Sequence, residues 1–405
     1  MTVNPSSNMS ALQSLIGMEA AEFFRSVAGR EYRISRAAHP DGLPNLREFD
    51  VVVSGQALSP ADIRLIKDGV PLERDRYTTM ASPPLVEGSK VVAALKANYT
   101  LVANRLHHLD PKCGTFARRL GEDLQCPVAV NAYFTPADSR GLSPHYDHHD
   151  VFVVQVEGEK TWRISPPVVA APTMHESWRF LTDAQVDEIE KKVEPPTEIV
   201  LRAGDVLYLP RGWMHSATAQ ERASFHITIS ADPVTRKEAL IQLIEMMSGK
   251  DDWFRQESNV YLGGPDEDTA EELRQALVRL SAGFASVSWP GLKDAVQRAS
   301  TKDLGTDGAK VIGSVLGMAR PAEFSTYRRR AGLRWSSHAL DETRVAIQLP
   351  GAKLALPEAA LSAVDLLLNG REVTRSEVAG LLDDDDVADQ LIGVLLQAGA
   401  LEPCP

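Results

Sequence analysis

The chain has 405 residues, of which 43% are hydrophobic and 24% charged, with 27 glycines and 25 prolines. This composition is typical of globular domains and excludes a collagen-like or largely disordered chain. Lysine and arginine number 43 against 55 aspartates and glutamates, so the formal net charge is −12. An acidic chain repels phosphate, which argues against broad binding to nucleic acid or anionic membranes and is compatible with a basic partner.

Neither the cysteines nor the apolar segments indicate a secreted or membrane protein. The three cysteines, Cys113, Cys126 and Cys404, form no C-x-x-C pair and are too few for a disulfide framework. The first residues lack a basic segment ahead of an apolar stretch, and no window approaches about 18 uninterrupted apolar residues. We therefore expect a cytoplasmic protein with no membrane span.

The N-terminal third reads as mixed α and β structure. Residues 1–10 are polar and are expected to be flexible, and the apolar spacing over 12–27 predicts one or two short amphipathic helices. Residues 101–120 look helical in two pieces, separated at Asp110-Pro111, because proline stops one helix and an aspartate cap followed by proline starts the next.

Residues 128–230 contain many short β-rich runs bounded by turn residues. Such runs at even spacing predict an antiparallel sandwich or barrel, of which the eight-stranded jelly roll is a common form. The predicted strands cover residues 127–134, 151–156, 161–164, 198–201, 206–209 and 225–230.

Beyond Asp232-Pro233 the apolar period changes to that of helices. Helices are predicted over residues 236–248, 269–285 and 291–299. Their apolar positions, which could extend beyond the needs of one domain, predict a homodimer; core packing within one monomer is the alternative. These positions are Leu240, Leu243, Ile244, Leu273, Leu277 and Leu280.

The last part of the chain resembles a winged helix. A strand is predicted at 344–349, and helices are predicted at 358–368, 376–382 and 387–398. Residues 351–405 hold 3 basic and 10 acidic residues, a net charge of −7. Winged helices that bind DNA need a cationic surface, so no direct DNA binding is expected. The acidic run 383–386 reads as a solvated turn.

One segment carries the pattern of a metal site. His145 and Asp147 lie at i and i+2, and on a strand two such side chains point to the same side. His215 follows a Pro-Arg-Gly turn 68 residues after Asp147, where a neighbouring strand could bring it alongside. Two imidazoles and a carboxylate form the facial triad of non-haem Fe(II) oxygenases. The alternative is that a lone His-x-Asp makes only surface hydrogen bonds.

These motifs resemble the JmjC/cupin-4 family of 2-oxoglutarate oxygenases, and within it the ribosomal oxygenases, which hydroxylate a histidine or arginine of a ribosomal protein. The resemblance is strong over about 100 residues and looser in the helical and C-terminal segments. The matching features are Asn131-x-Tyr133, Pro144-His-Tyr-Asp147, an apolar strand ending in Glu157-Gly158, Lys160-x-Trp162-Arg163, and Gly204-Asp205 with the Leu-Pro-Arg-Gly run ahead of His215.

The resemblance implies roles for seven residues. His145, Asp147 and His215 are the expected Fe(II) ligands. Lys160 is expected to hold the distal carboxylate of 2-oxoglutarate, the alternative being a solvent-facing strand residue. Asn131, Tyr133 and Thr228 are the further candidates for the cosubstrate pocket; Tyr133 is expected to place its hydroxyl next to Lys160, and Thr228 is as readily a plain strand residue.

Several neighbouring aromatic residues are expected to have other roles. His148 and His149 are predicted to be non-ligands, with His149 turned inward and His148 outward by strand parity. Trp162 and Trp213 are expected to pack in the barrel. His107, His108 and His226 are interpreted as structural, because no motif accompanies them.

The fold class implied is α+β: a double-stranded β-helix (jelly-roll, JmjC cupin) core, a helical dimerisation region and a C-terminal winged-helix-like module. The corresponding boundaries are 1–10 for the flexible N-terminus, 11–235 for the oxygenase domain, 236–325 for the dimerisation domain and 326–405 for the winged-helix-like domain.

The implied activity is that of an Fe(II)- and 2-oxoglutarate-dependent dioxygenase that hydroxylates a side chain of a basic ribosomal protein. Two alternatives stay open. One is a catalytically silent cupin that binds a peptide or partner protein. The other is an oxygenase acting on a small molecule or a natural-product peptide.

Overall fold

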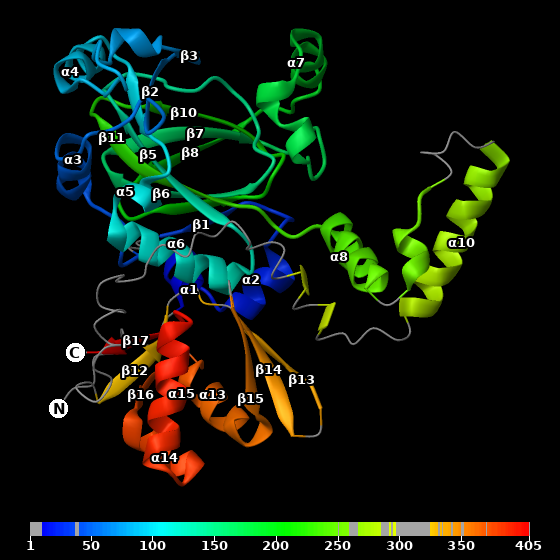
Figure 1. Cartoon of the computed structure of the whole chain (residues 1–405). Coiled ribbons are helices and arrows are strands. Elements are labelled where there is room, and N and C mark those ends of the chain that lie inside the picture. Colours follow the sequence, from blue (N-terminus) through cyan, green and yellow to red (C-terminus); the bar gives the residue numbers. More distant parts are fainter. Residues whose placement is uncertain are drawn as a thin grey trace. The chain divides into compact units, whose positions relative to one another are not determined.

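The computed structural model describes residues 10–36, 40–249, 251–258, 266–284, 291–292, 295–296, 325–330, 333, 335–341, 343–349, 352–369 and 371–404. The chain divides into two compact units, residues 1–233 and 234–405 (Figure 1). Among the described helices, none is both long and apolar enough to span a bilayer.

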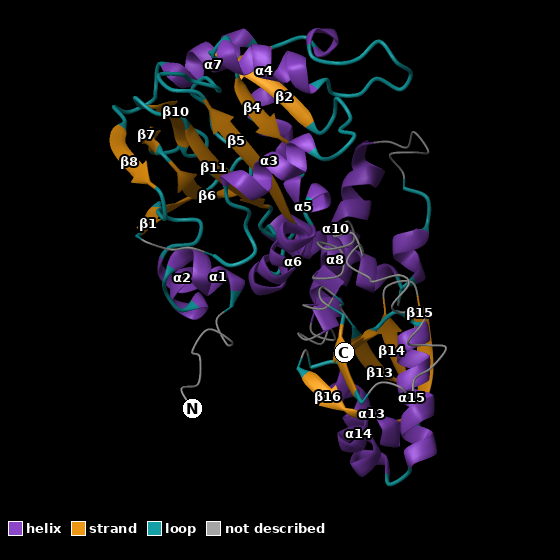
Figure 2. Cartoon of the chain, turned by 90° about the vertical axis from the view of Figure 1, so that its left-hand side faces the viewer, coloured by secondary structure: helices purple, strands orange, loops and turns teal. Residues whose placement is uncertain are grey.

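The N-terminal unit is built on two antiparallel sheets, drawn in orange in Figure 2. The larger has eight strands in the order β1 (Arg33–Ser35), β9 (Val206–Leu209), β6 (Asp150–Glu157), β11 (Ser224–Ala231), β5 (Val128–Thr135), β4 (Thr100–Ala103), β2 (Ile63–Lys67) and β3 (Val70–Pro71). The smaller consists of β10 (Met214–Ala219), β7 (Glu159–Ser165) and β8 (Thr197–Arg202).

Helices cover the outer face of the larger sheet. Phe23 and Phe49 from the helices pack in one apolar cluster with Phe152 and Phe225 from the strands. The helices and short 3-10 turns of this unit are α1 (Ala11–Ile16), α2 (Ala20–Ser26), α3 (Leu46–Ser54), η2 (Arg74–Arg76), α4 (Gly88–Lys96), α5 (Leu106–Leu109), α6 (Pro111–Leu124), η3 (Met174–Glu176), η4 (Trp178–Phe180) and α7 (Asp183–Glu190).

The inner face of the larger sheet packs against the smaller sheet. On β6 the side chains alternate, so Phe152 and Val154 join the helices while Val151 and Val153 contact the smaller sheet. Trp162 of β7 lies in the same inner cluster. Two sheets with a shared apolar interior form the predicted jelly-roll core, and the cavity described below opens between them.

All six predicted strands of this core are present, with ends within about two residues of those expected. The helix predicted from residue 101 is wrong at its start, because Thr100–Ala103 is fully buried strand β4 between β2 and β5. Strand β10 was not predicted, since its sequence, MHSATA, lacks the β-branched and aromatic run of a typical strand. Asp110 does cap α6, accepting a hydrogen bond from the Cys113 N–H.

The C-terminal unit combines helices with two small sheets, β16-β12-β17 and β13-β14-β15. Tyr327, Ile347 and Ile392 belong to its main apolar cluster. Its elements are α8 (Arg236–Ser248), η5 (Asp252–Arg255), α10 (Asp266–Phe284), β12 (Thr326–Arg329), β13 (Ser336–Ala339), β14 (Arg344–Leu349), β15 (Ala352–Pro357), η7 (Glu358–Ala360), α13 (Leu361–Leu367), β16 (Glu372–Thr374), α14 (Arg375–Leu382), α15 (Asp385–Gln397) and β17 (Leu401–Cys404).

The predicted helices and the strand at 344–349 appear in this unit close to the expected positions. The helix predicted over 291–299 lies largely outside the described residues. The acidic run forms a turn, as predicted: Asp383 is left-handed and Asp384 caps α15 through hydrogen bonds from two backbone N–H groups.

Candidate active site

A backbone bridge joins the two histidines of the predicted metal site, although 70 positions separate them in the sequence. The His145 N–H donates to the His215 carbonyl at 3.1 Å, and the His215 N–H donates to the His145 carbonyl at 2.8 Å. His215 lies near the start of β10, whereas His145 precedes β6. This pairing places both imidazoles on one wall of the cavity, with ring centroids 4.4 Å apart.

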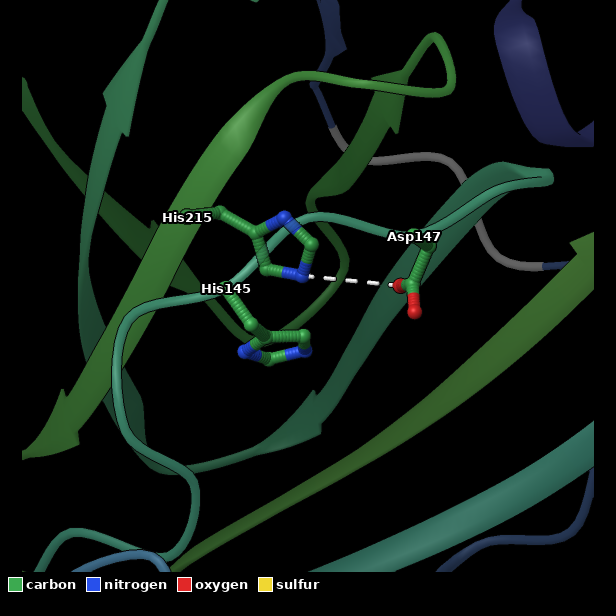
Figure 3. A group of neighbouring side chains, drawn as sticks. All are labelled: His145, Asp147 and His215. Carbon is green, nitrogen blue, oxygen red and sulfur yellow. Dashed lines mark ion pairs between the residues drawn. The ribbon is translucent and has the colours of Figure 1, made fainter. Parts of the chain in front are cut away.

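Asp147 completes the group, as Figure 3 shows. One potential ligand atom from each of the three residues lies within 4.8 Å of the other two, and His215 Nε2 is 3.6 Å from Asp147 Oδ2. Residues 143–149 form a loop with a single bridge, so the side chains converge through the His145–His215 pairing and not through strand alternation as predicted.

Hydrogen bonds indicate the tautomer of both rings. His145 Nδ1 lies 2.8 Å from the Ser143 carbonyl, and His215 Nδ1 lies 2.9 Å from the Trp213 carbonyl. A carbonyl only accepts hydrogen bonds, so each Nδ1 carries the proton and each Nε2 lone pair is free for a metal. Burial, followed by the neighbouring His145, lowers the pKa of His215 to about 4, which keeps that ring neutral.

The histidines determine the charge of Asp147. Burial alone would raise the pKa of this carboxyl, but four surrounding histidines, His149, His145, His215 and His148, hold it below its usual value. An ionised carboxylate beside two neutral imidazoles is the donor set that Fe(II) takes in a facial triad, with coordination positions left for other ligands. The residues present therefore fit the metal that the sequence predicts.

Backbone N–H groups of the Pro-Arg-Gly turn donate hydrogen bonds to the segment that carries Asp147. The Gly212 N–H donates to the Asp147 carbonyl at 2.9 Å, and the Arg211 N–H donates to Asp150 Oδ1 at 3.0 Å. Gly212 has φ +86°, and a Cβ there would lie 2.6 Å from the Val169 carbonyl oxygen. Only glycine fits this turn, which sets the position of His215 relative to Asp147.

The two histidines after the motif do not follow strand parity. His148 and His149 both line the cavity, so the prediction that His148 points outward is wrong, because the loop has no regular alternation. His149 Nε2 is 3.9 Å from Asp147 Oδ1, and neither residue belongs to the ligand cluster found among the described residues.

Lys160 lies inside the barrel on β7 with 4% of its surface exposed. Its Nζ donates to Thr135 Oγ1 at 3.0 Å, and burial lowers its pKa to about 7 with no carboxylate offsetting the cost. A buried cation without a counter-ion is unfavourable unless a ligand supplies the charge. The prediction that Lys160 faces inward, and not the solvent, is confirmed.

Asn131, Tyr133 and Thr228 all line the same cavity, from β5 and β11. Thr228 pairs directly with Asn131 across these strands. Tyr133 stacks on His226 with ring centroids 4.8 Å apart. Thr135, and not Tyr133 as predicted, supplies the hydroxyl that lies beside Lys160.

Some residues in or next to the cavity were missed from the sequence. His226 was interpreted as structural but lines the cavity, and Trp162 packs in the barrel as predicted and also lines the cavity. Among the described residues His226 Nδ1 and Trp162 Nε1 are buried without a hydrogen-bond partner. Thr135 shares the face of Asn131 and Tyr133 at period two, a signal that could have identified it. Trp213 packs against Tyr32, as predicted.

The cavity has a volume of about 440 Å³, within the range of small-molecule sites. The His145–Asp147–His215 group and Lys160 both line it. The other residues that line the cavity include Arg64, Tyr146, Ser177, Trp178 and Arg179.

Comparison with known proteins agrees with this site. Residues 111–239 match the family model of the JmjC domain. The chain is 38% identical over 145 residues to the bifunctional lysine-specific demethylase and histidyl-hydroxylase NO66 of Drosophila persimilis, and 40% identical over 127 residues to NO66 of Drosophila yakuba. The first alignment covers 32% of this chain and 20% of that relative, the second 31% and 17%. The chain thus matches a fifth or less of the length of these relatives.

Solved structures share the fold. The Escherichia coli ribosomal oxygenase YcfD aligns with a TM-score of 0.54 and 14% sequence identity, over 96% of this chain and 98% of that one. A second structure of YcfD, in complex with cobalt and 2-oxoglutarate, aligns with the same TM-score. The likeness therefore extends through both units of the chain at the level of fold.

Proposed function

Because residues 111–239 match the family model of the JmjC domain, we propose that the chain is an Fe(II)- and 2-oxoglutarate-dependent protein hydroxylase. One observation carries the proposal: the His145, Asp147 and His215 group shares a single cavity with a buried lysine that has no counter-ion. The group offers the metal ligands, and Lys160 offers the charge that a dicarboxylate needs.

In this proposal the metal and cosubstrate supply the oxidation chemistry, and the protein positions them. Bound Fe(II) supplies dioxygen activation for hydroxylation of a C–H bond, coupled to oxidative decarboxylation of 2-oxoglutarate. The protein fixes the ligands through the His145–His215 bridge and the Gly212 turn, orients the cosubstrate with Lys160, and surrounds both with apolar wall residues such as Val151 and Val153.

The cavity favours an uncharged target side chain, so we infer histidine in preference to arginine. Arg64 and Arg179 line the wall, while Asp147, a proposed ligand, is the only carboxylate among the lining residues. A guanidinium entering such a cavity would lose its hydration without gaining a carboxylate partner. NO66 is described as a histidyl-hydroxylase, which agrees with this choice.

A basic ribosomal protein in the cytoplasm is the proposed substrate, because the net charge of −12 favours encounter with a basic surface and YcfD is described as a ribosomal oxygenase. Intact mass spectrometry of ribosomal proteins, with and without the active chain, tests this. The proposal requires one added oxygen that fragmentation places on histidine and that the Asp147→Ala variant does not produce. Addition to arginine would overturn the choice of residue.

Two other functions make different predictions from the same cavity. A silent cupin would bind a peptide without turning over 2-oxoglutarate. An oxygenase for a small molecule or natural-product peptide would turn it over but leave ribosomal proteins unmodified. Succinate release measured with and without ribosomal proteins therefore separates the three functions.

For the C-terminal unit we propose a helical dimerisation region, 236–325, followed by a winged-helix-like domain, 326–405. Leu243 is buried and Leu280 packs beside it, so core packing accounts for these two predicted positions. The others, Leu240, Ile244, Leu273 and Leu277, are exposed, with 68% of Leu277 accessible. Exposed leucines on two helices favour a homodimer, and a monomeric mass by light scattering at micromolar concentration would contradict it.

Within the winged-helix-like domain, residues 351–405 are proposed to contact protein and not DNA. Two of the three basic residues in 351–405 already form ion pairs, Arg371 with Glu377 and Arg375 with Asp389. Few cations remain to displace counter-ions from a phosphate backbone. Fluorescence anisotropy with labelled duplex DNA at about 50 mM salt tests this, and micromolar binding would overturn it.

A further inference from the structure

The ammonium of Lys160 donates a hydrogen bond to a buried threonine, Thr135. An ammonium has three hydrogens to donate, and Thr135 Oγ1, at 3.0 Å, is its one hydrogen-bond acceptor given by the described structure. Thr135 is the last residue of β5 and has no exposed surface. The bond thus fixes one N–H direction and leaves two hydrogens of Lys160 for the cavity.

A second threonine continues this contact to the cavity wall. Thr100 Oγ1, on the adjacent strand β4, lies 3.3 Å from Thr135 Oγ1. Thr100 is 1% exposed and lines the cavity, whereas Thr135 is not among the lining residues. Lys160, Thr135 and Thr100 therefore form a row of polar groups that begins and ends at the cavity.

The position of Thr100 is restricted by its neighbour Gly141. A Cβ at residue 141 would lie 3.0 Å from Thr100 Oγ1 and 3.2 Å from its Cγ2. Any larger residue at 141 would press on the Thr100 side chain. The packing therefore keeps the Thr100 hydroxyl beside Thr135.

Proton accounting gives the pair a direction. The protonated Lys160 amine can only donate, so Thr135 Oγ1 accepts from it, and the second lone pair of Thr135 Oγ1 accepts the hydroxyl hydrogen of Thr100. In that arrangement both neighbours point a hydrogen at the same oxygen, and Thr100 orients the Thr135 hydroxyl that holds the ammonium.

We propose that Thr135 is a positioning residue for Lys160 and the carboxylate which Lys160 holds, and that Thr100 orients the Thr135 hydroxyl by donating a hydrogen bond to it. This rests on the proposed function, in which that carboxylate is the distal one of 2-oxoglutarate. It goes beyond the assigned lysine, because it makes cosubstrate affinity depend on two hydroxyls from strands β4 and β5 that no motif marks.

The test is calorimetric binding of 2-oxoglutarate to the Mn(II)-loaded full chain. Thr135→Val and Thr100→Val keep the side-chain shape and remove the hydroxyl. Thr135→Val should weaken cosubstrate binding about tenfold, as expected for the loss of a hydrogen bond to a charged group, and Thr100→Val should weaken it by a smaller factor. Mn(II) affinity should not change. The matched control is Thr161→Val on β7, which removes a hydroxyl that bonds Gln220 outside the cavity.

Serine variants separate positioning from packing. Thr135→Ser keeps the hydroxyl and should restore affinity, although it loses a methyl group from a buried site. Thr135→Val should also move the pH at which affinity begins to fall to a lower value, because the unpartnered ammonium loses its proton more readily; Tyr133 and His226, which also face this part of the cavity, are unchanged in both variants.

Three results would overturn the inference. Wild-type affinity in both valine variants would remove the hydroxyls from the site. Equal losses in Thr135→Ser and Thr135→Val would show that packing alone is involved. Failure of the wild-type chain to bind 2-oxoglutarate would overturn the proposed function itself, and this inference with it. If Thr135→Val does not fold, Thr135→Ala and Thr135→Ser form the comparison.

Discussion

The two ends of the cavity are built by different means. At the metal end, three ligands come from two short motifs, and a reciprocal pair of backbone hydrogen bonds joins His145 to His215. At the other end, one lysine on β7 meets a hydroxyl from β5, which in turn meets a hydroxyl from β4. The metal end is held by backbone, whereas the Lys160 end depends on side chains.

Because of this difference, we expect substitutions at the metal ligands and at Lys160 to have different effects. Metal ligands act together on one ion, so losing one should disable the centre. Lys160 is buried with a hydroxyl partner but with no carboxylate beside it among the described residues, so its charge is unfavourable there and a bound dianion would offset that cost. The predictions below separate these two behaviours.

The largest effect is expected at the metal end. His145→Ala, Asp147→Ala or His215→Ala should each abolish 2-oxoglutarate turnover and weaken metal binding by about tenfold or more, because each removes one of three ligands. Isothermal titration with Fe(II) under anaerobic conditions measures the binding. His148→Ala is the matched control: it removes a histidine that lines the same cavity but is not a proposed ligand, and the variant should bind metal as tightly as the wild type. Normal turnover in any alanine variant would remove that residue from the ligand set.

Removing the cation should affect the cosubstrate alone. Lys160→Ala should weaken 2-oxoglutarate binding roughly ten- to two-hundred-fold, the range for a charge-assisted contact, and leave metal affinity unchanged. Titrating the Mn(II)-loaded variant with 2-oxoglutarate checks both. Unchanged cosubstrate affinity would mean that another cation, such as Arg64 at the same cavity, holds the carboxylate.

Cosubstrate affinity should fall at alkaline pH. Burial lowers the pKa of Lys160 to about 7 in the empty cavity, so above that pH binding of the dianion must be accompanied by proton uptake. The dissociation constant should then rise about tenfold per pH unit, and calorimetry in buffers of different ionisation enthalpy should detect the proton. Flat affinity between pH 7 and pH 9 would contradict an ammonium that titrates in this range.

The smallest effect concerns stability. The pKa of Lys160 is lowered from 10.5 in the unfolded chain to about 7 in the folded protein, so its burial costs stability fully below pH 7, and the cost disappears as the pH approaches 10.5. Lys160→Met should therefore raise Tm at neutral pH, by roughly 2–4 °C for each kcal/mol gained in the free energy of unfolding. At pH 10 the increase in Tm should be smaller. A lower Tm in this variant would show that Lys160 stabilises the fold.

The sequence allowed the core strands from residue 127 onward, the helices over 12–27 and 111–120, and the grouping of His145, Asp147 and His215 to be predicted, because hydrophobic period and short motifs are local. It did not allow strand β10, or the loop geometry that brings His145 to His215, to be predicted, since both depend on pairing across distant segments. Thr100 directly precedes the segment that was predicted to be helical from residue 101. Its role needs the register of β4 against β5.

The acid–base character of the cavity was also beyond the sequence. His226 was without a partner motif, and the structure places it on the cavity wall, where burial and then Lys160 lower its pKa well below the usual value. Burial of this kind is set by the closure of the two sheets and not by neighbouring residues in the chain. The ligand motif is readable locally, but the electrostatics of its cavity are not.

The central claim is that metal and 2-oxoglutarate bind together in this cavity. The most direct measurement is an anaerobic optical titration of the full chain with Fe(II), with and without 2-oxoglutarate. The account predicts a visible metal-to-ligand charge-transfer band only when both are present, lost in Asp147→Ala and requiring more cosubstrate in Lys160→Ala. A wild-type spectrum that 2-oxoglutarate leaves unchanged at saturating Fe(II) would contradict it.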